Sequence, residues 1–485
     1  MVLLEAGNRL GGKAGADFSE DHQCYIEHGY HVFPAWYPNT RQLLRELGIE
    51  GNLIDLKRSH ALKPGAFPQM ASFEELSSFG NVLKTLFRGE RPWAETLLSY
   101  YYYVDLTCTP LRRTGLLDRI SANGFLRSRF YATEGVSDFN QQRVLQASSI
   151  PVYEMSAMAL QKVITLWAAN PKPFLSILNG NLQERFIAPF QRDLEALGVD
   201  IRLHQSVAKL ETAAGCITGL CFDDGRRLEA AGADDLFVLA IPPEAVLRLI
   251  DDDVFAAEQL HVGETDSLTG LVHLKSVPMA GFTLYLNSRV DRLPTQPTFL
   301  DGSRHHLSFI DLSQYWPELA GENTVLSVIA AHFEPLKGLS HNKMAEILID
   351  ELSEYLPIGP KDIEHWHLQE NVSAPLFLNT VGSWRYRPGT RTRLPNMYIT
   401  GDYCRTPVEL TTMESAVMSG LRTAQAILTD YLGQPAANRV EFLPLKTFST
   451  VALWLMKYAG LPVVVLLYIL LRLNLLPQTH LQDEA

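Results

Sequence analysis

The sequence predicts an α/β protein with several domains, and three stretches of the chain carry that prediction. Residues 2–4 form an apolar run that ends in an acidic residue, which is typical of a buried parallel strand. Residues 268–335 hold alternating or apolar segments that suggest a second, mixed sheet. Residues 448–477 are strongly apolar and predict a hydrophobic C-terminal helix. A length of 485 residues fits roughly two or three domains.

Composition and charge argue against some classes of function. The net charge of −12 disfavours nucleic acid as a partner, because phosphate binding needs a concentrated basic face. The five cysteines are scattered, so they fit neither a disulfide framework nor a zinc site and favour free thiols in a reducing compartment. Residues 1–6 lack the basic region and the long apolar run of a signal peptide.

The first half of the chain is expected to begin with a strand and to continue mainly as helices. Residues 40–47 predict a short amphipathic helix, which Asn39 or Thr40 can cap and Gly48 ends. Residues 72–170 carry helical signals and many aromatic side chains, which indicate a helical subdomain.

From residue 180 onward, helices and strands follow one another more regularly. We expect a helix over residues 181–197 that Gly198 closes, and a long helix over residues 411–432. A turn at 223–225 predicts a hairpin. Strands are expected at 199–204, 206–211, 217–222, 226–229, 236–240, 272–274, 282–286, 325–331 and 397–400, and a further helix at 342–356.

The first segment that indicates chemistry lies at the N-terminus. In a dinucleotide-binding βαβ unit, the second strand ends in an acid that binds the adenosine ribose, and Glu5 has that position. No glycine-rich turn comes before it, so about 25–30 residues of a complete unit are expected to be missing. In residues 9–13 (RLGGK), paired glycines allow a phosphate or flavin to approach the backbone and the flanking cations offer charge. A solvated loop is the alternative.

The second such segment is residues 401–420. An acid after a strand and a glycine, as at Gly401-Asp402, can bind ribose or ribityl hydroxyls. Thr411 and Glu414 have the spacing of a capping box, so a helix is expected to begin there. Its N-terminus would direct N–H groups and partial positive charge at a reduced flavin. An ordinary capped helix is the alternative.

Several of these motifs together resemble a known family. The segments LLEA at 3–6, RLGGK at 9–13 and EHGYHVF at 27–33 look like the N-terminal region of plant- and cyanobacterial-type phytoene and zeta-carotene desaturases. GDY at 401–403 and MESAVMSG at 413–420 are similar to the C-terminal flavin motif of that family. The resemblance runs in order over roughly residues 1–430, and it belongs to the FAD-dependent amine-oxidase and phytoene-desaturase superfamily.

The resemblance implies a site for FAD. Glu5 would hold the ribose, and Asp402 the ribityl or pyrophosphate region. Val207 would contact the adenine through its backbone, and Met413 would donate its N–H to the ring. The full set of implied cofactor-binding residues is Glu5, Arg9, Gly11, Gly12, Lys13, Gly29, Tyr30, His31, Val207, Gly401, Asp402, Met413 and Glu414. Two positions depart from the family pattern, Ser415 in place of a glycine and His28 in place of a small residue.

The resemblance also implies a division of the chain. We expect a Rossmann-like FAD-binding domain without its first βα unit, an inserted mixed-sheet substrate domain, a helical subdomain and a hydrophobic C-terminal helix. The expected ranges are 1–70, 176–250 and 391–435 for the FAD-binding domain, 71–175 for the helical substrate or membrane subdomain, 251–390 for the substrate domain, and 436–485 for the tail.

The apolar tail suggests contact with a membrane. Residues 451–471 contain one charge, Lys457, and one proline, Pro462, and Arg472 follows them. Roughly 20 apolar residues cross a bilayer, so this segment predicts either a marginal spanning helix or a helix in the interface. A buried core helix is the alternative. The expected location is membrane-associated, peripheral or through this single helix, on the cytoplasmic side.

The implied reaction is desaturation of a carotenoid or isoprenoid polyene. A hydride would pass from an allylic carbon to flavin N5, because no side chain accepts a hydride, and a membrane quinone would reoxidise the flavin. His28, His31 and Arg387 are candidates for the base, with structural roles as the alternative.

Two other functions stay open. One is a flavin oxidoreductase acting on a squalene-type lipid or an amine, like hydroxysqualene dehydroxylases or amine oxidases. The other is a non-catalytic lipid-binding protein with a degenerate flavin fold, which the absent glycine-rich turn favours. Without that turn the chain is expected to hold FAD weakly, because the pyrophosphate loses N–H donors and a helix dipole. A hydrolase is disfavoured, since neither G-x-S-x-G nor H-E-x-x-H occurs.

Overall fold

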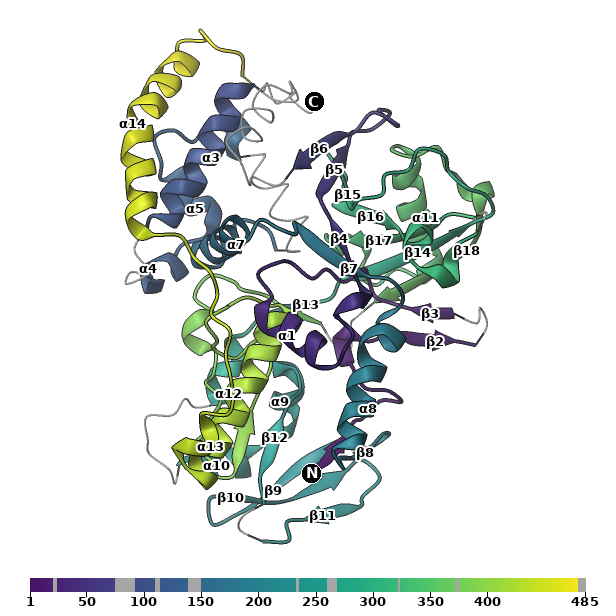
Figure 1. The fold of residues 1–485 in the computed structure, drawn as a ribbon, viewed down its shortest axis with the longest axis vertical. Coiled ribbons are helices and arrows are strands. Elements are labelled where there is room, and N and C mark those ends of the chain that lie inside the picture. Colours follow the sequence, from purple (N-terminus) through teal and green to yellow (C-terminus); the bar gives the residue numbers. More distant parts are fainter. Residues whose placement is uncertain are drawn as a thin grey trace.

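The structure is a computed structural model of the whole chain. It describes residues 1–20, 24–74, 92–109, 114–137, 150–232, 235–259, 268–321, 323–370 and 375–478. Parts of the predicted helical subdomain, at 75–91, 110–113 and 138–149, lie outside the described residues. The fold is mixed α/β, and Figure 1 shows a lower region that contains the N-terminus, a sheet region beside α11, and a helical region that α14 borders.

The structure confirms the second, mixed sheet that the sequence predicts, and this sheet has seven strands among the described residues. Its strands are antiparallel except for the parallel pair β15–β5. The strand order is β18 (Ile363–Glu370), β14 (Ala280–Leu286), β17 (Val325–Ala330), β16 (Leu307–Asp311), β15 (Thr298–Leu300), β5 (Arg58–Leu62) and β6 (Ala71–Glu74). Residues from the first 75 positions therefore complete a sheet whose other strands come from the range 298–370 and from β14.

The two faces of this sheet differ in polarity because side chains alternate along each strand. Phe282 and Leu284 of β14, with Val328 of β17, point to one face and pack with Leu348 of α11 (His341–Ser353) in an apolar core. The opposite face carries polar residues, among them Tyr285, and lies against the segment that follows β3. This second face is buried too, which brings polar side chains into the interior.

Two parallel pairs and a three-stranded sheet make up the lower region. β1 (Val2–Leu4) pairs with β8 (Asp200–Arg202), and β12 (Phe237–Leu239) pairs with β20 (Met397–Ile399). β9 (Val207–Ala213), β10 (Cys216–Phe222) and β11 (Arg227–Glu229) form an antiparallel sheet that includes the predicted hairpin. The parallel pairing of β1 is confirmed. Its expected burial is wrong, because Val2 is 45% exposed and β8 is its sole partner strand among the described residues.

Three short antiparallel pairs and several helices join these sheets. The pairs are β2 (Asp17–Ser19) with β3 (Cys24–Ile26), β4 (Leu53–Leu56) with β7 (Leu175–Leu178), and β13 (Ser276–Val277) with β19 (Leu376–Phe377). The helices of the lower region are α1 (Pro38–Glu46), α8 (Ala188–Ala196), α9 (Pro243–Leu249), α10 (Asp252–Gln259), α12 (Met413–Leu432) and α13 (Gln434–Ala437).

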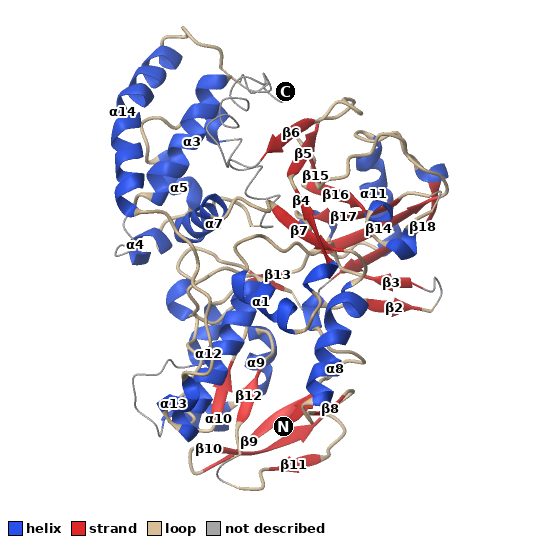
Figure 2. Cartoon of the chain, viewed as in Figure 1, coloured by secondary structure: helices blue, strands red, loops and turns tan. Residues whose placement is uncertain are grey.

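The helical region contains helices that lie far apart in sequence (Figure 2). Its members are α3 (Trp93–Thr107), α4 (Thr114–Asp118), α5 (Ala122–Arg127), α7 (Ala157–Ala169) and α14 (Thr450–Arg472). α14 is the one described helix long and apolar enough to cross a membrane, with a mean hydropathy of 1.9 over its most apolar window. That window is 11% buried, so the alternative of a buried core helix is wrong.

Three predicted elements differ from the structure for local reasons. The helix expected over 181–197 begins as a π-helical turn at Gln183–Ile187, where Pro189 has no N–H for a regular helical bond. The strand expected at 272–274 is part of a 3-10 helix at Leu268–His273, in which Leu268 and Leu271 are buried at the i, i+3 spacing. α1 begins at Pro38 with Tyr37 before it, so the predicted caps Asn39 and Thr40 lie inside the helix.

Candidate functional site

The segment after β1 folds into a tight loop whose backbone conformation requires glycine. Glu5 Oε1 accepts a hydrogen bond from the Gly7 N–H at 2.7 Å, so this carboxylate closes the turn at the end of the strand. Gly11 has φ +108° and Gly12 has φ +51°, conformations that other residues rarely adopt. A Cβ on Gly11 would lie 2.8 Å from Ile187 Cγ1, whereas Gly12 has open space around it.

The two cations of this loop have different surroundings. Arg9 Nε is 2.6 Å from Asp17 Oδ1, and Arg9 also donates to the carbonyl oxygens of Leu10 and Gly12. Arg9 therefore binds β2 and its own loop. Lys13 lies close enough to Asp402 to lower the pKa of that carboxyl, against the larger effect of burial, which raises it. The structure thus brings together the N-terminal and C-terminal segments that the sequence predicts for the cofactor.

His28 and His31 lie beside this loop, with ring centroids 5.1 Å apart. Burial lowers the pKa of His28 to about 3, and His31, Arg9 and Lys13 lower it further. Burial also lowers the pKa of His31 to about 4, although hydrogen bonds with the backbone of Gly29 and Lys13 act in the opposite direction. Both rings are therefore neutral at pH 7, and His31 is held between two segments of backbone.

Gly281 of β14 allows the segment around His28 to approach the polar face of the sheet. A Cβ at residue 281 would lie 2.2 Å from the carbonyl carbon of His28 and 2.7 Å from the nitrogen of Gly29. Tyr30 continues the same contact, with its hydroxyl 3.2 Å from Ser308 Oγ on β16. The predicted residues 28–31 are thus placed between the sheet and the loop at 9–13.

Arg387 fixes the turn that contains Asp402. It is buried, with 1% exposure, and donates to three consecutive carbonyl oxygens of residues 402, 403 and 404 at 2.7, 2.9 and 2.9 Å. Its third nitrogen, Nη1, donates to Asn379 Oδ1 at 3.2 Å. Each guanidinium nitrogen has a partner, so the geometry assigns Arg387 a positioning function. Its predicted role as a base is untested by these contacts.

The N-terminus of α12 differs from the predicted capping box. The helix begins at Met413, and its capping side chain is Thr412, whose hydroxyl accepts from the Ser415 N–H at 3.2 Å. Thr411 instead donates its hydroxyl to the carbonyl of Phe377. Glu414 faces α1, where it accepts hydrogen bonds from Asn39 and Thr40. The predicted cap at Thr411 is therefore wrong, because both members of the expected box bind other elements.

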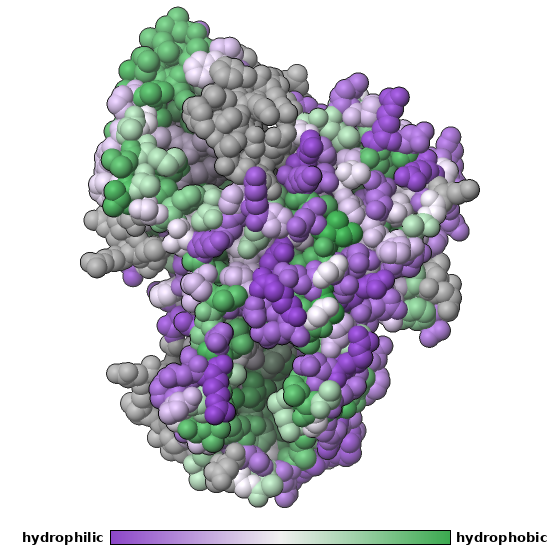
Figure 3. Space-filling model, viewed as in Figure 1, coloured by the Kyte–Doolittle hydropathy of each residue, from purple (hydrophilic) through white to green (hydrophobic). Residues whose placement is uncertain are grey.

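Val207 lies farther along the same edge as Glu5. Val207 is the first residue of β9, where it pairs with Phe222. Two residues earlier in the chain, the N–H of Gln205 donates to the carbonyl oxygen of Glu5 at 2.8 Å. The order along the chain thus places Glu5 and Val207 near one another. The surface is hollowed and apolar between the α9 and α8 sides of this lower region (Figure 3).

Buried polar atoms near Asp402 fit a ligand with hydroxyl donors. Both carboxylate oxygens of Glu244 on α9 and the hydroxyl of Tyr403 are buried and have no hydrogen-bond partner among the described residues. Glu244 is near enough to raise the pKa of Asp402. Buried polar groups are normally hydrogen-bonded, so these atoms indicate a missing polar partner. The ribityl and ribose hydroxyls of a flavin dinucleotide would supply that chemistry.

The structure also adds residues that the sequence did not single out. Glu27 is buried, its Oε1 accepts from the Leu182 N–H at 2.6 Å, and burial raises its pKa to about 8. Tyr285, His365 and His367 lie together on the polar face of the sheet, with the Tyr285 and His365 rings stacked at 4.0 Å. The alternation of polar and apolar residues in HWHLQ at 365–369 is the signal that could have identified this face.

Comparison with known proteins gives a consistent match over most of the chain. The sequence profile described as flavin containing amine oxidoreductase matches residues 1–428. The chain is 25% identical to a 15-cis-phytoene desaturase of Solanum lycopersicum, over 89% of this chain and 74% of that protein. It is 26% identical to a 15-cis-phytoene desaturase of Synechococcus elongatus, over 88% of this chain and 90% of that protein.

A solved structure supports the same fold. A variant of putrescine oxidase redesigned in its cofactor binding superposes with a TM-score of 0.63, covering 88% of this chain and 93% of that protein at 16% identity. At this identity the likeness concerns the fold. α14 lies beyond the residues that the profile matches.

Proposed function

The chain belongs to the family of flavin containing amine oxidoreductases with FAD as its cofactor, and we propose that it desaturates a carotenoid or isoprenoid polyene. The observation that carries the proposal is the similarity to 15-cis-phytoene desaturases over almost nine-tenths of the chain. The relatives are named as desaturases of 15-cis-phytoene. The exposed apolar helix α14 suits a substrate that is dissolved in a membrane.

The charge state of the site supports an apolar substrate. His28 and His31 are neutral at pH 7, because their pKa values are about 3 and about 4. A cation beside a polyene would lose its hydration without gaining a partner, which is costly. Neutral rings held by the backbone avoid that cost.

FAD, when bound, supplies the hydride acceptor that no side chain can provide. We propose that Glu5, Lys13 and Asp402 hold the cofactor, and that the backbone N–H of Met413 at the start of α12 faces its ring. Arg387 keeps Asp402 in place. His31, fixed by Gly29 and Lys13, borders the ring and shapes the substrate side. The remaining assignments of the predicted cofactor set, including Val207 and Glu414, are part of the same proposal.

A second candidate function is oxidation of an amine or another polar substrate. The polar face formed by Tyr285, His365 and His367 favours it, because such side chains can hydrogen-bond a polar substrate. The family match and the putrescine oxidase fold are compatible with it.

Anaerobic reduction of the flavin separates these functions. The chain is saturated with FAD, mixed in turn with phytoene in vesicles, squalene in vesicles and putrescine, and followed by the loss of flavin absorbance. Reduction by phytoene alone, with a more unsaturated product, confirms the proposal. Reduction by squalene or by putrescine would instead indicate a squalene-type lipid or an amine as the substrate class. FAD binding without reduction by any of the three, or phytoene binding without FAD, favours the lipid-binding alternative. Reoxidation by an added quinone then tests the proposed electron acceptor.

A further inference from the structure

The helix α14 has one face that binds protein and one that is exposed. Leu453, Val464, Leu467 and Leu471 are buried at helical spacing, with exposures of 9%, 2%, 3% and 1%. The outer face, which consists of Val451, Trp454, Leu455, Tyr458, Leu466 and Ile469, is between 44% and 69% exposed. Figure 3 shows this apolar surface at the end of the molecule where Figure 1 places α14.

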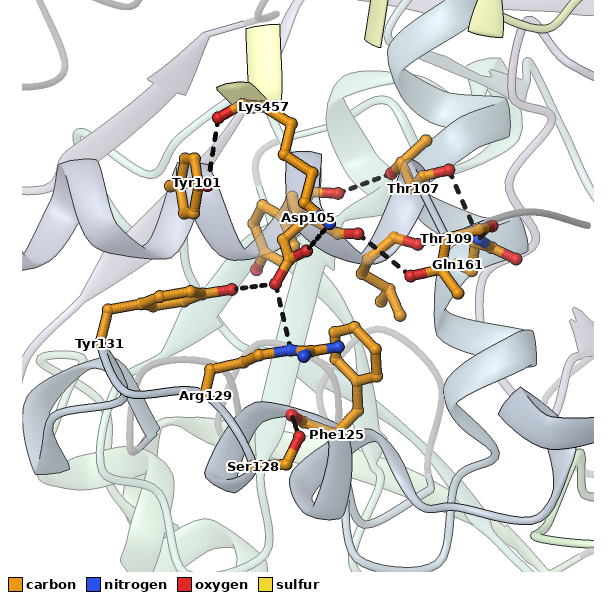
Figure 4. A network of polar contacts seen from close by, with 12 residues as sticks. Tyr101, Asp105, Thr107, Thr109, Phe125, Ser128, Arg129, Tyr131, Gln161 and Lys457 are labelled. Carbon is orange, nitrogen blue, oxygen red and sulfur yellow. Dashed lines mark hydrogen bonds and ion pairs between the residues drawn. The ribbon is translucent and has the colours of Figure 1, made fainter. Parts of the chain in front are cut away.

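Of the two charged residues in α14, Arg472 ends the helix and Lys457 is turned toward the protein. Lys457 Nζ lies 2.6 Å from Asp105 Oδ1 on α3, and Asp105 is buried with a side-chain exposure of 6%. Asp105 Oδ2 also accepts from the Tyr131 hydroxyl at 2.8 Å and lies 3.1 Å from Arg129 Nε. Figure 4 shows Lys457 approaching Asp105 from α14, and Arg129 and Tyr131 approaching it from the segment after α5.

Two further contacts fix the same stretch of α14 against α3. The hydroxyl of Tyr101 donates to the backbone carbonyl of Lys457 at 3.1 Å, and a Cβ on Gly460 would lie 3.3 Å from the Tyr101 ring. To span a bilayer, α14 would have to leave α3. That would strip one cation from a buried carboxylate and expose Lys457 to lipid, and breaking a buried ion pair is strongly unfavourable.

We propose that α14 binds a lipid bilayer from one side and lies in the plane of one leaflet, fastened to α3 by the Lys457–Asp105 ion pair. Between Val451 and Leu471 the outer face carries no charged side chain, which suits hydrocarbon. Trp454 and Tyr458 on the outer face lie with ring centroids 5.0 Å apart, and such amphipathic aromatic rings suit the headgroup level of a bilayer. Arg472, which closes the helix beside Tyr468, suits anionic headgroups.

The partner is thus a phospholipid surface. This inference shares with the proposed function only the contact with a membrane, and its test measures binding and topology without turnover. A failed desaturation assay would therefore not contradict the proposed binding of α14 to lipid. Conversely, a failure to bind vesicles would not contradict the proposed reaction, which flavin reduction in detergent tests independently.

Co-sedimentation with vesicles of phosphatidylcholine and phosphatidylglycerol tests the binding. Leu455→Asp and Leu466→Asp on the outer face are expected to weaken binding about tenfold or more, because each brings a charge to the apolar contact. Leu197→Asp is the matched control, since Leu197 is 74% exposed but lies after α8. The proposal is overturned if the unsubstituted chain and the three variants bind the vesicles equally. It is also overturned if the chain forms a dimer in solution and does not bind vesicles.

Cysteine labelling on sealed vesicles tests the topology. Ser449→Cys and Leu475→Cys place thiols just outside the two ends of α14, at exposed positions. An impermeant maleimide added outside the vesicles is expected to label the two introduced cysteines equally, and each variant more strongly than the unsubstituted chain. The labelling should not increase when detergent is added. Labelling of one position and protection of the other until detergent is added shows a spanning helix and overturns the proposal.

Discussion

The carboxylate of Glu414 binds both polar groups of Thr40, its Oε2 accepting from the Thr40 N–H at 2.8 Å and from the hydroxyl at 2.7 Å. Its Oε1 accepts in the same way from the backbone and side-chain nitrogens of Asn39, at 3.0 and 2.8 Å. A side chain in the first turn of α12 thus satisfies the free N–H groups that open α1. This contact joins two segments that lie more than 370 positions apart in the sequence.

Replacement of Glu414 by alanine is expected to lower the free energy of unfolding by roughly 2–4 kcal/mol, because four buried donors lose their acceptor. Urea unfolding followed by circular dichroism measures the change. The control is Glu46→Ala, an exposed residue at the end of the same helix α1, which should have little effect. Equal changes of the free energy of unfolding in the two variants would show that the contact of Glu414 with α1 does not contribute to stability.

Arg387→Met is expected to weaken FAD binding about tenfold or more, because the turn of residues 402–404 loses the donors that align Asp402. Arg387→Lys should recover part of this affinity, since lysine keeps the charge but not the forked geometry. Titration with FAD, read by quenching of flavin fluorescence, gives the dissociation constants. Arg385→Met, at an exposed arginine two residues away, is the control. Unchanged affinity in Arg387→Met would separate this turn from the cofactor.

Gly281→Ala tests the approach of the sheet to the segment at His28. The new methyl group would lie 2.2 Å from the His28 carbonyl carbon, which is backbone and cannot rotate away. We expect a loss of roughly 2–4 kcal/mol in stability together with weaker FAD binding. Gly420→Ala, on an exposed face of α12 with open space around it, should instead be neutral or slightly stabilising. Normal stability and FAD binding in Gly281→Ala would refute the close contact.

Glu27 predicts a pH dependence of stability. Its pKa is raised in the folded protein to about 8 from 4.5, chiefly by burial. Between these values the unfolded chain releases this proton and the folded chain keeps it, so the contribution of Glu27 to stability is lost as the pH rises. His28 and His31 have lowered pKa values and act in the opposite direction below about pH 6.5.

The contribution of Glu27 is isolated by comparing the wild-type protein with Glu27→Gln. The free energy of unfolding of the wild type, relative to the variant, should fall by roughly 3 kcal/mol between pH 5 and pH 8. Urea unfolding at four pH values measures it, with Glu46→Gln as an exposed control. A difference that does not change with pH would show that Glu27 titrates normally.

The sequence predicts the elements of this fold where the pattern is local. Turn residues identify the hairpin of β10 and β11, and Gly48 and Gly198 mark helix ends at positive φ, as expected. The inserted mixed sheet is confirmed as well. The sequence does not predict that β5 and β6 join that sheet, because the pairing of β5 with β15 joins residues about 240 positions apart.

In the candidate site, too, the sequence predicts local motifs but not the contacts between segments that lie far apart in the chain. Motifs place Glu5, Lys13, His31 and Asp402 in one neighbourhood, and the contacts of Lys13 with the other segments agree with that grouping. The capping role of Glu414 toward α1 could not be read from its spacing to Thr411, because the choice between them depends on which helix packs beside α12. The buried polar face at Tyr285 and His365 was missed, because alternation alone predicts an exposed polar face.

Glu244 gives a test in which affinity and stability move in opposite directions. Its two carboxylate oxygens are buried without a hydrogen-bond partner among the described residues, and such a group destabilises the protein that carries it. Glu244→Leu is therefore expected to raise the stability of the FAD-free chain by roughly 1 kcal/mol. If these oxygens accept from hydroxyls of the cofactor, the same change should weaken FAD binding about tenfold. Glu195→Leu, on the exposed side of α8, should change neither quantity. Thermal unfolding with and without FAD measures both effects on one sample, and a parallel loss of stability and affinity would instead indicate a purely structural carboxylate.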